Sequence, residues 1–84
     1  MEFKDLKGWK RRIDYSLYHK DSKYEAYVSP DGTKIAQVHM NDKAIALVFN
    51  RTTKQIEYIH PTTARGAKKL GINIETFMTQ MYSK

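Results

Sequence analysis

The sequence predicts a small α+β domain, in which a four- to five-stranded antiparallel meander precedes a C-terminal pair of helices. Two patterns lead to this prediction. Over residues 13–60, runs in which apolar and polar residues alternate are separated by short turn signals. After Pro61 the apolar residues recur at helical spacing. A chain of 84 residues can build one modest core, so we expect residues 1–84 to form a single domain.

Residues 1–12 are expected to form an N-terminal arm or a short helix. Phe3, Leu6 and Trp9 have helix-like spacing, although Gly8 interrupts the pattern. A solvated charged surface is the simplest interpretation of the cations in this segment, and a secondary arm that contacts phosphates is the sharper one. These cations are Lys7, Lys10, Arg11 and Arg12.

Alternation predicts the first two strands. The first runs from residue 13 to residue 19, with its odd-numbered residues on one buried face. After a turn over residues 19–23, the even-numbered residues of 24–28 form the buried face of a second strand. The sequence Ser-Pro-Asp-Gly at 29–32 then predicts a turn.

The remaining strands follow the same logic. A third strand is predicted over residues 34–40. The apolar run at 44–49, inside a fourth strand at 43–50, indicates a mid-sheet position with both faces covered. The last strand, 54–60, is expected to place alternate residues on one face, namely Ile56, Tyr58 and His60.

Residues 62–83 are predicted to fold as two helices joined by a glycine turn. Thr62 or Thr63 is expected to cap the first helix, and Gly71 can adopt the left-handed conformation that ends it. Asn73 is expected to cap the second helix. The second helix has one continuous apolar face, formed by Ile74, Phe77, Met78, Met81 and Tyr82.

The run Ala-Lys-Lys-Leu-Gly-Ile-Asn at 67–73 resembles the turn region of bacterial and phage helix-turn-helix motifs. Residues 49–59 look like a hairpin that leads directly into it. Residues 49–82 are therefore similar to the small hairpin-plus-helix-turn-helix modules (NUMOD type) that are appended to phage homing endonucleases. The resemblance implies binding to nucleic acid, to double-stranded DNA rather than RNA, without catalysis or cofactor.

Two sets of contacts follow from this resemblance. Side chains expected to grip phosphates are Arg51, Lys54, Arg65, Lys68 and Lys69. Side chains expected to face base edges from the second helix are Asn73, Glu75, Thr76, Thr79 and Gln80. A monomer would read only a short site, so a homodimer would give more useful specificity.

The charge distribution agrees with an anionic partner. The formal net charge is +6. Residues 1–42 hold eight Lys and Arg against seven acids, whereas residues 43–84 hold seven against two. The excess therefore lies in the half that carries the predicted helices, as a polyanion partner would require.

Two other functions stay open. A small phage-type inhibitor or adaptor could dock on a host protein through Met78, Met81 and Tyr82. A metal-free ribonuclease is the third interpretation, because residues 8–34 faintly resemble the HicA toxin family. Its acid, base and phosphate clamp would come from His39, Tyr58, His60 and Arg51.

The sequence indicates neither a metal site nor a membrane segment. His19, His39 and His60 lie on different predicted strands without metal-ligand spacing. The longest apolar run is far too short to span a bilayer, and the chain has no cysteine. We therefore expect a cytoplasmic protein without a metal.

Overall fold

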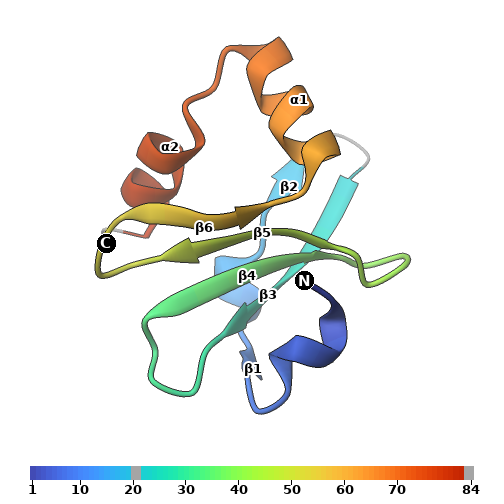
Figure 1. Ribbon diagram of the computed structural model, residues 1–84, viewed down its shortest axis with the longest axis vertical. Helices are drawn as coiled ribbons and strands as arrows, with labels where there is room; N and C mark the ends of the chain where they lie inside the picture. Colours follow the sequence, from blue (N-terminus) through green and yellow to red (C-terminus); the bar gives the residue numbers. More distant parts are fainter. Residues whose placement is uncertain (20–21, 83–84) are drawn as a thin grey trace.

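The computed structural model describes residues 1–19 and 22–82, and it contains a five-stranded antiparallel meander followed by two helices (Figure 1). The strands follow the order β1-β3-β4-β5-β6, and β2 pairs with β3 off this path. This confirms the predicted α+β class. The elements are η1 (Phe3–Leu6), β1 (Lys10–Arg11), η2 (Ile13–Tyr15), β2 (Tyr18–His19), β3 (Ser22–Val28), β4 (Lys34–His39), β5 (Ile45–Asn50), β6 (Gln55–Ile59), α1 (Pro61–Leu70) and α2 (Ile74–Met81).

The prediction of a continuous first strand at 13–19 is wrong. Ile13 begins the 3₁₀ helix η2 and its side chain is 68% exposed. The Arg12 side chain donates two hydrogen bonds to Asp14, at 2.9 and 2.7 Å, and these hold a turn rather than an extended strand. Part of the predicted turn that follows, residues 20–21, lies outside the described residues.

A terminal segment covers each face of the sheet. On one face, Leu6 of η1 packs against a cluster that includes Val38 and Val48. On the other face, Met78 of α2 is fully buried against Leu47 and Phe49. Strand β5 is therefore covered on both faces, which confirms its predicted mid-sheet position.

A bulge changes the alternation of β6. Val48 lies opposite Tyr58 and Phe49 lies opposite Ile56, so Glu57 is the extra residue between them. Ile56 consequently packs with the cluster under α2, whereas Tyr58 packs with the cluster on the opposite face. The prediction that Ile56 and Tyr58 share one face is therefore wrong.

The helix ends follow local chemistry. The predicted threonine cap of α1 is wrong, because the helix begins at Pro61 and the His60 side chain accepts a hydrogen bond from the Thr62 N–H at 3.2 Å. Gly71 has a left-handed φ of 72° and ends α1 as predicted. Asn73 caps α2 as predicted, since its side chain accepts from the Thr76 N–H at 3.0 Å.

The two helices differ in how they meet the sheet. No side chain of α1 is buried, and Figure 1 shows α1 standing beyond the edge strand β6. The helix α2 packs on the sheet through Met78, although Phe77, predicted to be on its apolar face, is 45% exposed. Residue 83, the end of the predicted pair, lies outside the described residues.

Candidate nucleic-acid interface

Three cations lie on one side of α1. Arg65, Lys68 and Lys69 are spaced by three and four residues, so their side chains share one helix face. All three are exposed, and none forms an ion pair with any described residue. Lys68 and Lys69 lie in the last turn, where positive charge is favourable next to the helix carbonyls. The helix therefore presents a basic face, defined here as Arg65, Lys68 and Lys69, directly to solvent.

The acids of the described segments are occupied elsewhere. Glu2, Asp14 and Glu57 pair with Lys4, Arg12 and Lys34 at 3.1, 2.7 and 2.9 Å. The remaining carboxylates accept hydrogen bonds or ion pairs from within the chain, namely Asp5, Glu25, Asp31, Asp42 and Glu75. As a result, the charge of the basic face is not neutralised from inside the described part of the protein.

The Glu25 carboxylate is the buried acid of the sheet, and its charge is compensated by neighbouring side chains. It is buried on β3, where it accepts a hydrogen bond from Lys43 Nζ at 2.7 Å and another from the Tyr27 hydroxyl at 2.8 Å. The Lys43 bond, then the Tyr27 bond, lowers the pKa of Glu25 despite the opposing effect of burial. Arg11 adds a longer contact at 3.8 Å. The Glu25–Lys43 ion pair therefore neutralises charge within the fold.

The hairpin cations do not join the basic face. Arg51 and Lys54 precede β6, whereas α1 follows it, so the length of β6 separates the two groups (Figure 1). Arg51 is half-buried, with its guanidinium carbon 5.4 Å from the centre of the Tyr15 ring. The structure thus divides the five predicted phosphate contacts into two sites.

The polar residues of α2 that were predicted to face bases contribute to the fold itself. Asn73 caps the helix, and Glu75 Oε2 accepts a hydrogen bond from the Ile56 N–H of the edge strand at 2.9 Å. The Thr79 hydroxyl donates to the Glu75 carbonyl at 2.7 Å. Thr76 and Gln80 are exposed on the same helix. Base reading from α2 would therefore compete with contacts that hold the sheet edge and the helix.

The N-terminal basic arm is remote from α1. Strand β1 pairs with β3 at one edge of the sheet, whereas β6 forms the other edge. Lys7 and Lys10 are exposed, while Arg12 is held by Asp14 and lies 4.3 Å from the centre of the Tyr15 ring. The arm and the basic face are therefore separate surfaces.

Two polar contacts at buried or edge positions were not anticipated from the sequence. Gln37 is fully buried, and its Nε2 donates to the Tyr15 carbonyl at 2.8 Å and to the Tyr82 hydroxyl at 2.6 Å. A polar residue in phase with Ile35 was the available signal. The Glu75 contact with Ile56 left no such signal, because a surface glutamate near a helix start is ordinary.

The predicted ribonuclease set is not assembled. Arg51 and His60 lie at opposite ends of β6. The His39 ring packs against the Tyr24 ring at a centroid distance of 4.7 Å, with the planes tilted by 45°, and His60 caps α1. The His19 side chain is not among the side chains that the structure describes. Among the residues that are described, no cluster of three His, Asp or Glu side chains could hold a metal ion.

The function has to be inferred from the fold and from the geometry of the candidate site. No family model, curated protein or solved structure matches this chain. Neither helix within the described segments is long and apolar enough to cross a membrane.

Proposed function

We propose that this protein is a small nucleic-acid-binding protein that contacts the phosphates of double-stranded DNA through the basic face of α1. The observation that carries the proposal is that Arg65, Lys68 and Lys69 are exposed and have no ion-pair partner among the described residues, on a helix that buries none of its own side chains. A helix that stands clear of the sheet can approach a phosphate backbone without steric interference from the domain (Figure 1).

Binding of this kind is mainly electrostatic. Each lysine or arginine that neutralises a phosphate releases condensed counterions, so affinity falls with salt. Because Asn73, Glu75 and Thr79 already hold the fold together, α2 contributes little to base reading in this proposal. The protein is therefore expected to bind DNA with weak sequence preference.

The salt dependence tests this proposal. Three phosphate contacts predict a slope of log affinity against log salt of about −2.7, which is an affinity loss of about 40-fold between about 50 and about 200 mM salt. Fluorescence anisotropy with a mixed-sequence duplex measures the slope. Replacing Lys68 or Lys69 with alanine should reduce its magnitude by about 0.9.

Lys23→Ala is the matched control, because Lys23 is an exposed lysine on β3, outside the basic face, with no ion pair to any residue that the structure describes. Its slope should equal that of the wild type. If Lys23→Ala reduces the slope as much as Lys68→Ala, or if wild-type binding is insensitive to salt, the basic face is not the contact surface.

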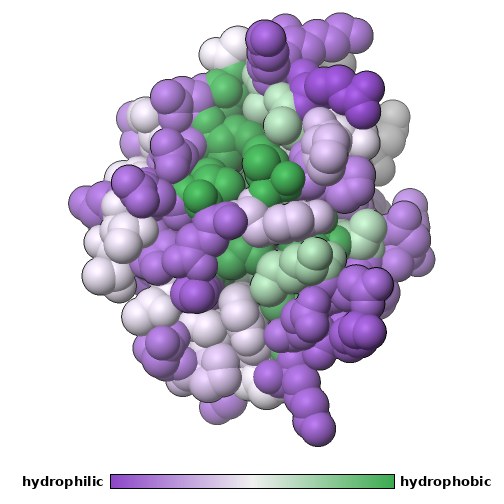
Figure 2. Space-filling view, viewed as in Figure 1, coloured by the Kyte–Doolittle hydropathy of each residue, from purple (hydrophilic) through white to green (hydrophobic). Residues whose placement is uncertain are grey.

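An apolar surface favours protein docking as a second candidate function. Leu70, Ile72 and Phe77 are 52%, 39% and 45% exposed, at the end of α1, in the linker and on α2. Figure 2 shows apolar surface between the two helices, in the region where Figure 1 places this linker. The neighbouring basic face would suit a partner segment that combines apolar and acidic side chains.

Phe77→Ser separates the two candidates. The substitution should leave the salt slope for DNA unchanged, because Phe77 carries no charge. It should abolish capture of a protein partner or self-association, which pull-down and light-scattering mass measure. If Phe77→Ser also abolishes DNA binding, the apolar surface and not the basic face is the main contact surface.

A further inference from the structure

A depression of about 570 Å³ lies between the β3–β4 turn, the β5–β6 turn and α2. Gly32 comes from the first turn, Arg51, Thr52 and Lys54 come from the second, and Thr79 comes from α2. Two of the lining side chains are cations and none is a carboxylate. The depression is therefore positively charged, in contrast to the paired charges across most of the sheet.

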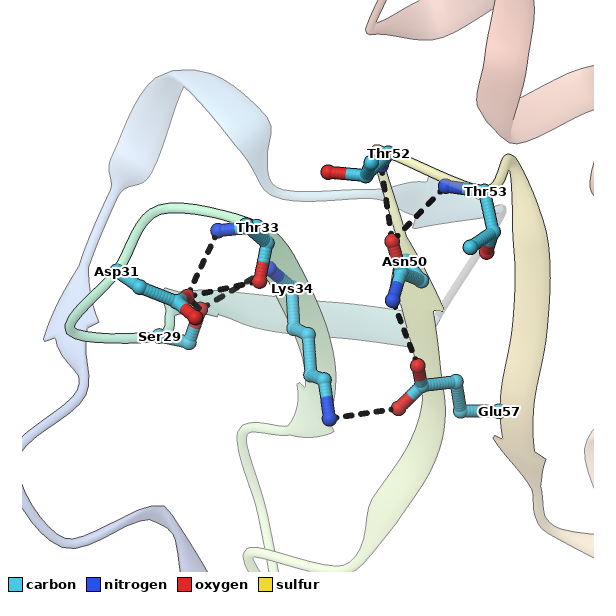
Figure 3. A network of polar contacts seen from close by, with 8 residues as sticks. All are labelled: Ser29, Asp31, Thr33, Lys34, Asn50, Thr52, Thr53 and Glu57. Carbon is cyan, nitrogen blue, oxygen red and sulfur yellow. Dashed lines mark hydrogen bonds and ion pairs between the residues drawn. The ribbon is translucent and has the colours of Figure 1, made fainter.

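The polar contacts around the depression hold its two turns in place (Figure 3). The Arg51 N–H donates to the Thr33 carbonyl at 2.7 Å and so joins the turns directly. Behind them, Glu57 accepts from Lys34 at 2.9 Å and from Asn50 at 2.7 Å. The Asn50 side chain in turn accepts from the backbone N–H groups that follow it. The cations are thus presented by a preorganised frame.

Arg51 retains most of its donors for a ligand. Its side chain makes one weak hydrogen bond within the described residues, from Nη1 to the Gly32 carbonyl at 3.5 Å. The Tyr15 ring supports the guanidinium from one side. A guanidinium has several N–H groups in a planar fork, which matches two oxygens of a phosphate.

Lys54 has an unusual backbone for its residue type. Lys43 and Lys54 are the two described non-glycine residues with a left-handed φ, at 60° and 61°. The Lys43 ammonium forms an ion pair with buried Glu25 at 2.7 Å. Lys54 has no such partner among the described residues and instead lines the depression beside Arg51. The hairpin turn accounts for the φ of Lys54, because the Lys54 N–H donates to the Asn50 carbonyl at 2.8 Å. The ammonium group is therefore left available to a ligand.

Three threonine hydroxyls line the depression, and they differ in whether they can donate a hydrogen bond to a ligand. The Thr33 hydroxyl donates to Asp31 at 2.8 Å and the Thr79 hydroxyl to the Glu75 carbonyl. The Thr52 hydroxyl has no partner within the described segments, so it can donate to a ligand. Asp31, the nearest acid in the turn, accepts from Ser29 and Thr33 and does not line the depression.

We infer that this depression binds the dianionic phosphate of a phosphomonoester, with Arg51, Lys54 and Thr52 as its ligands. Two positive charges match the two negative charges of such a group, and the guanidinium fork can bind two of its oxygens. The phosphate could belong to a free nucleotide or to the end of a nucleic-acid strand. This site shares no residue with the basic face of α1, so the inference is independent of the proposed DNA binding and can be tested separately.

Nuclear magnetic resonance titration tests the site. Inorganic phosphate should shift the backbone amide signals of Gly32, Arg51, Thr52 and Lys54, whereas sodium chloride at equal ionic strength should not. Arg51→Ala and Lys54→Gly should each weaken binding by about tenfold. Lys54→Gly is the sharper variant, because glycine accepts the left-handed φ and the fold is retained without the ammonium group.

Lys23→Ala controls for the general loss of one positive charge and should bind phosphate like the wild type. The inference is overturned if chloride reproduces the shifts, or if Lys54→Gly binds phosphate as tightly as the wild type. Retained phosphate binding in a Lys68→Ala variant that has lost duplex affinity would show that the two sites are independent.

Two further ligands identify the source of the phosphate. A nucleoside monophosphate that binds as tightly as a 5′-phosphorylated oligonucleotide indicates a free nucleotide. A 5′-phosphorylated oligonucleotide that binds more tightly than both the nucleotide and its 5′-hydroxyl counterpart indicates a strand end. In either case, Lys54→Gly should weaken binding of the phosphorylated ligand by about tenfold and leave that of its unphosphorylated counterpart unchanged, and an unchanged affinity for the phosphorylated ligand would contradict the site.

Discussion

At the scale of single residues, one buried amide connects three distant parts of the chain. Gln37 contacts the Tyr15 carbonyl, the Tyr82 hydroxyl and the Leu17 N–H, the last through Oε1 at 3.3 Å. The Tyr82 hydroxyl also donates to the Tyr15 carbonyl at 2.9 Å. Burial raises the pKa of Tyr82, so this hydroxyl keeps its proton at ordinary pH. The network fixes the end of α2 on the sheet, and it thereby positions the helix pair.

Gln37→Leu should therefore lower the free energy of unfolding by about 2 kcal/mol, because the Leu17 N–H loses its acceptor and Tyr82 loses a donor. Gln55→Leu is the matched control, since Gln55 is an exposed glutamine on strand β6. It should change stability by less than about 0.5 kcal/mol. Urea unfolding measures both variants. Equal effects at the two positions would show that the buried network adds nothing beyond side-chain replacement.

At the scale of elements, turns were easier to predict than the segments that pack against them. The turn at 29–32 and the glycine elbow at Gly71 are set by local residues, and both form as predicted. The first predicted strand is interrupted by the turn that Arg12 and Asp14 hold, and Tyr15 at the end of that turn packs on Tyr82, with ring centroids 5.1 Å apart, a contact between distant parts of the chain. The residues near Tyr15 in the sequence do not indicate that Tyr82 will be its packing partner.

The β3–β4 turn also predicts a pH dependence. Hydrogen bonds from the Ser29 hydroxyl and from the Thr33 N–H and hydroxyl hold the pKa of Asp31 at about 2. A carboxylate with a lowered folded pKa stabilises the fold above its unfolded pKa, which is about 4. This contribution is lost as the pH falls from about 4 towards 2. Stability should therefore decline over that window and stay level above it.

Asp31→Asn tests this pH dependence, because the amide cannot titrate. Urea unfolding at several pH values should show a shallower acid decline for the variant than for the wild type. Some decline should remain, since Asn50 and Lys34 lower the pKa of Glu57, and Lys43 lowers that of Glu25. Parallel curves for the variant and the wild type would mean that Asp31 is not a source of the acid sensitivity.

At the scale of the whole molecule, the candidate sites depend on arrangement more than on composition. The sequence identifies the cations of the helix pair and the hairpin, and the structure exposes Lys68 and Lys54 as expected. The predicted strand at 54–60 already lies between the two groups of cations, so their division into two sites follows from the predicted order of elements. The sequence does not reveal the Glu57 bulge, which changes the face of every later residue in the strand.

The sheet divides the core into two layers that should respond independently to substitution. Ile45 belongs to the cluster under η1, whereas Phe49 and Met78 belong to the cluster under α2. Ile45→Val should cost about 1 kcal/mol and Met78→Ala about 3 kcal/mol. Because the sheet separates the two sites, their combined effect should be additive within about 0.5 kcal/mol.

The matched comparison pairs Met78→Ala with Phe49→Leu, since both side chains are buried in one cluster. A cavity left by Met78 can be partly filled when its neighbour Phe49 also changes shape, so this double variant should depart from additivity by at least about 0.5 kcal/mol. Urea unfolding of the three single and two double variants measures both cycles. Coupling between Ile45 and Met78 as strong as that between Phe49 and Met78 would mean that the two layers act as one. A substitution beneath η1 would then also alter how α2 and the basic face of α1 are held.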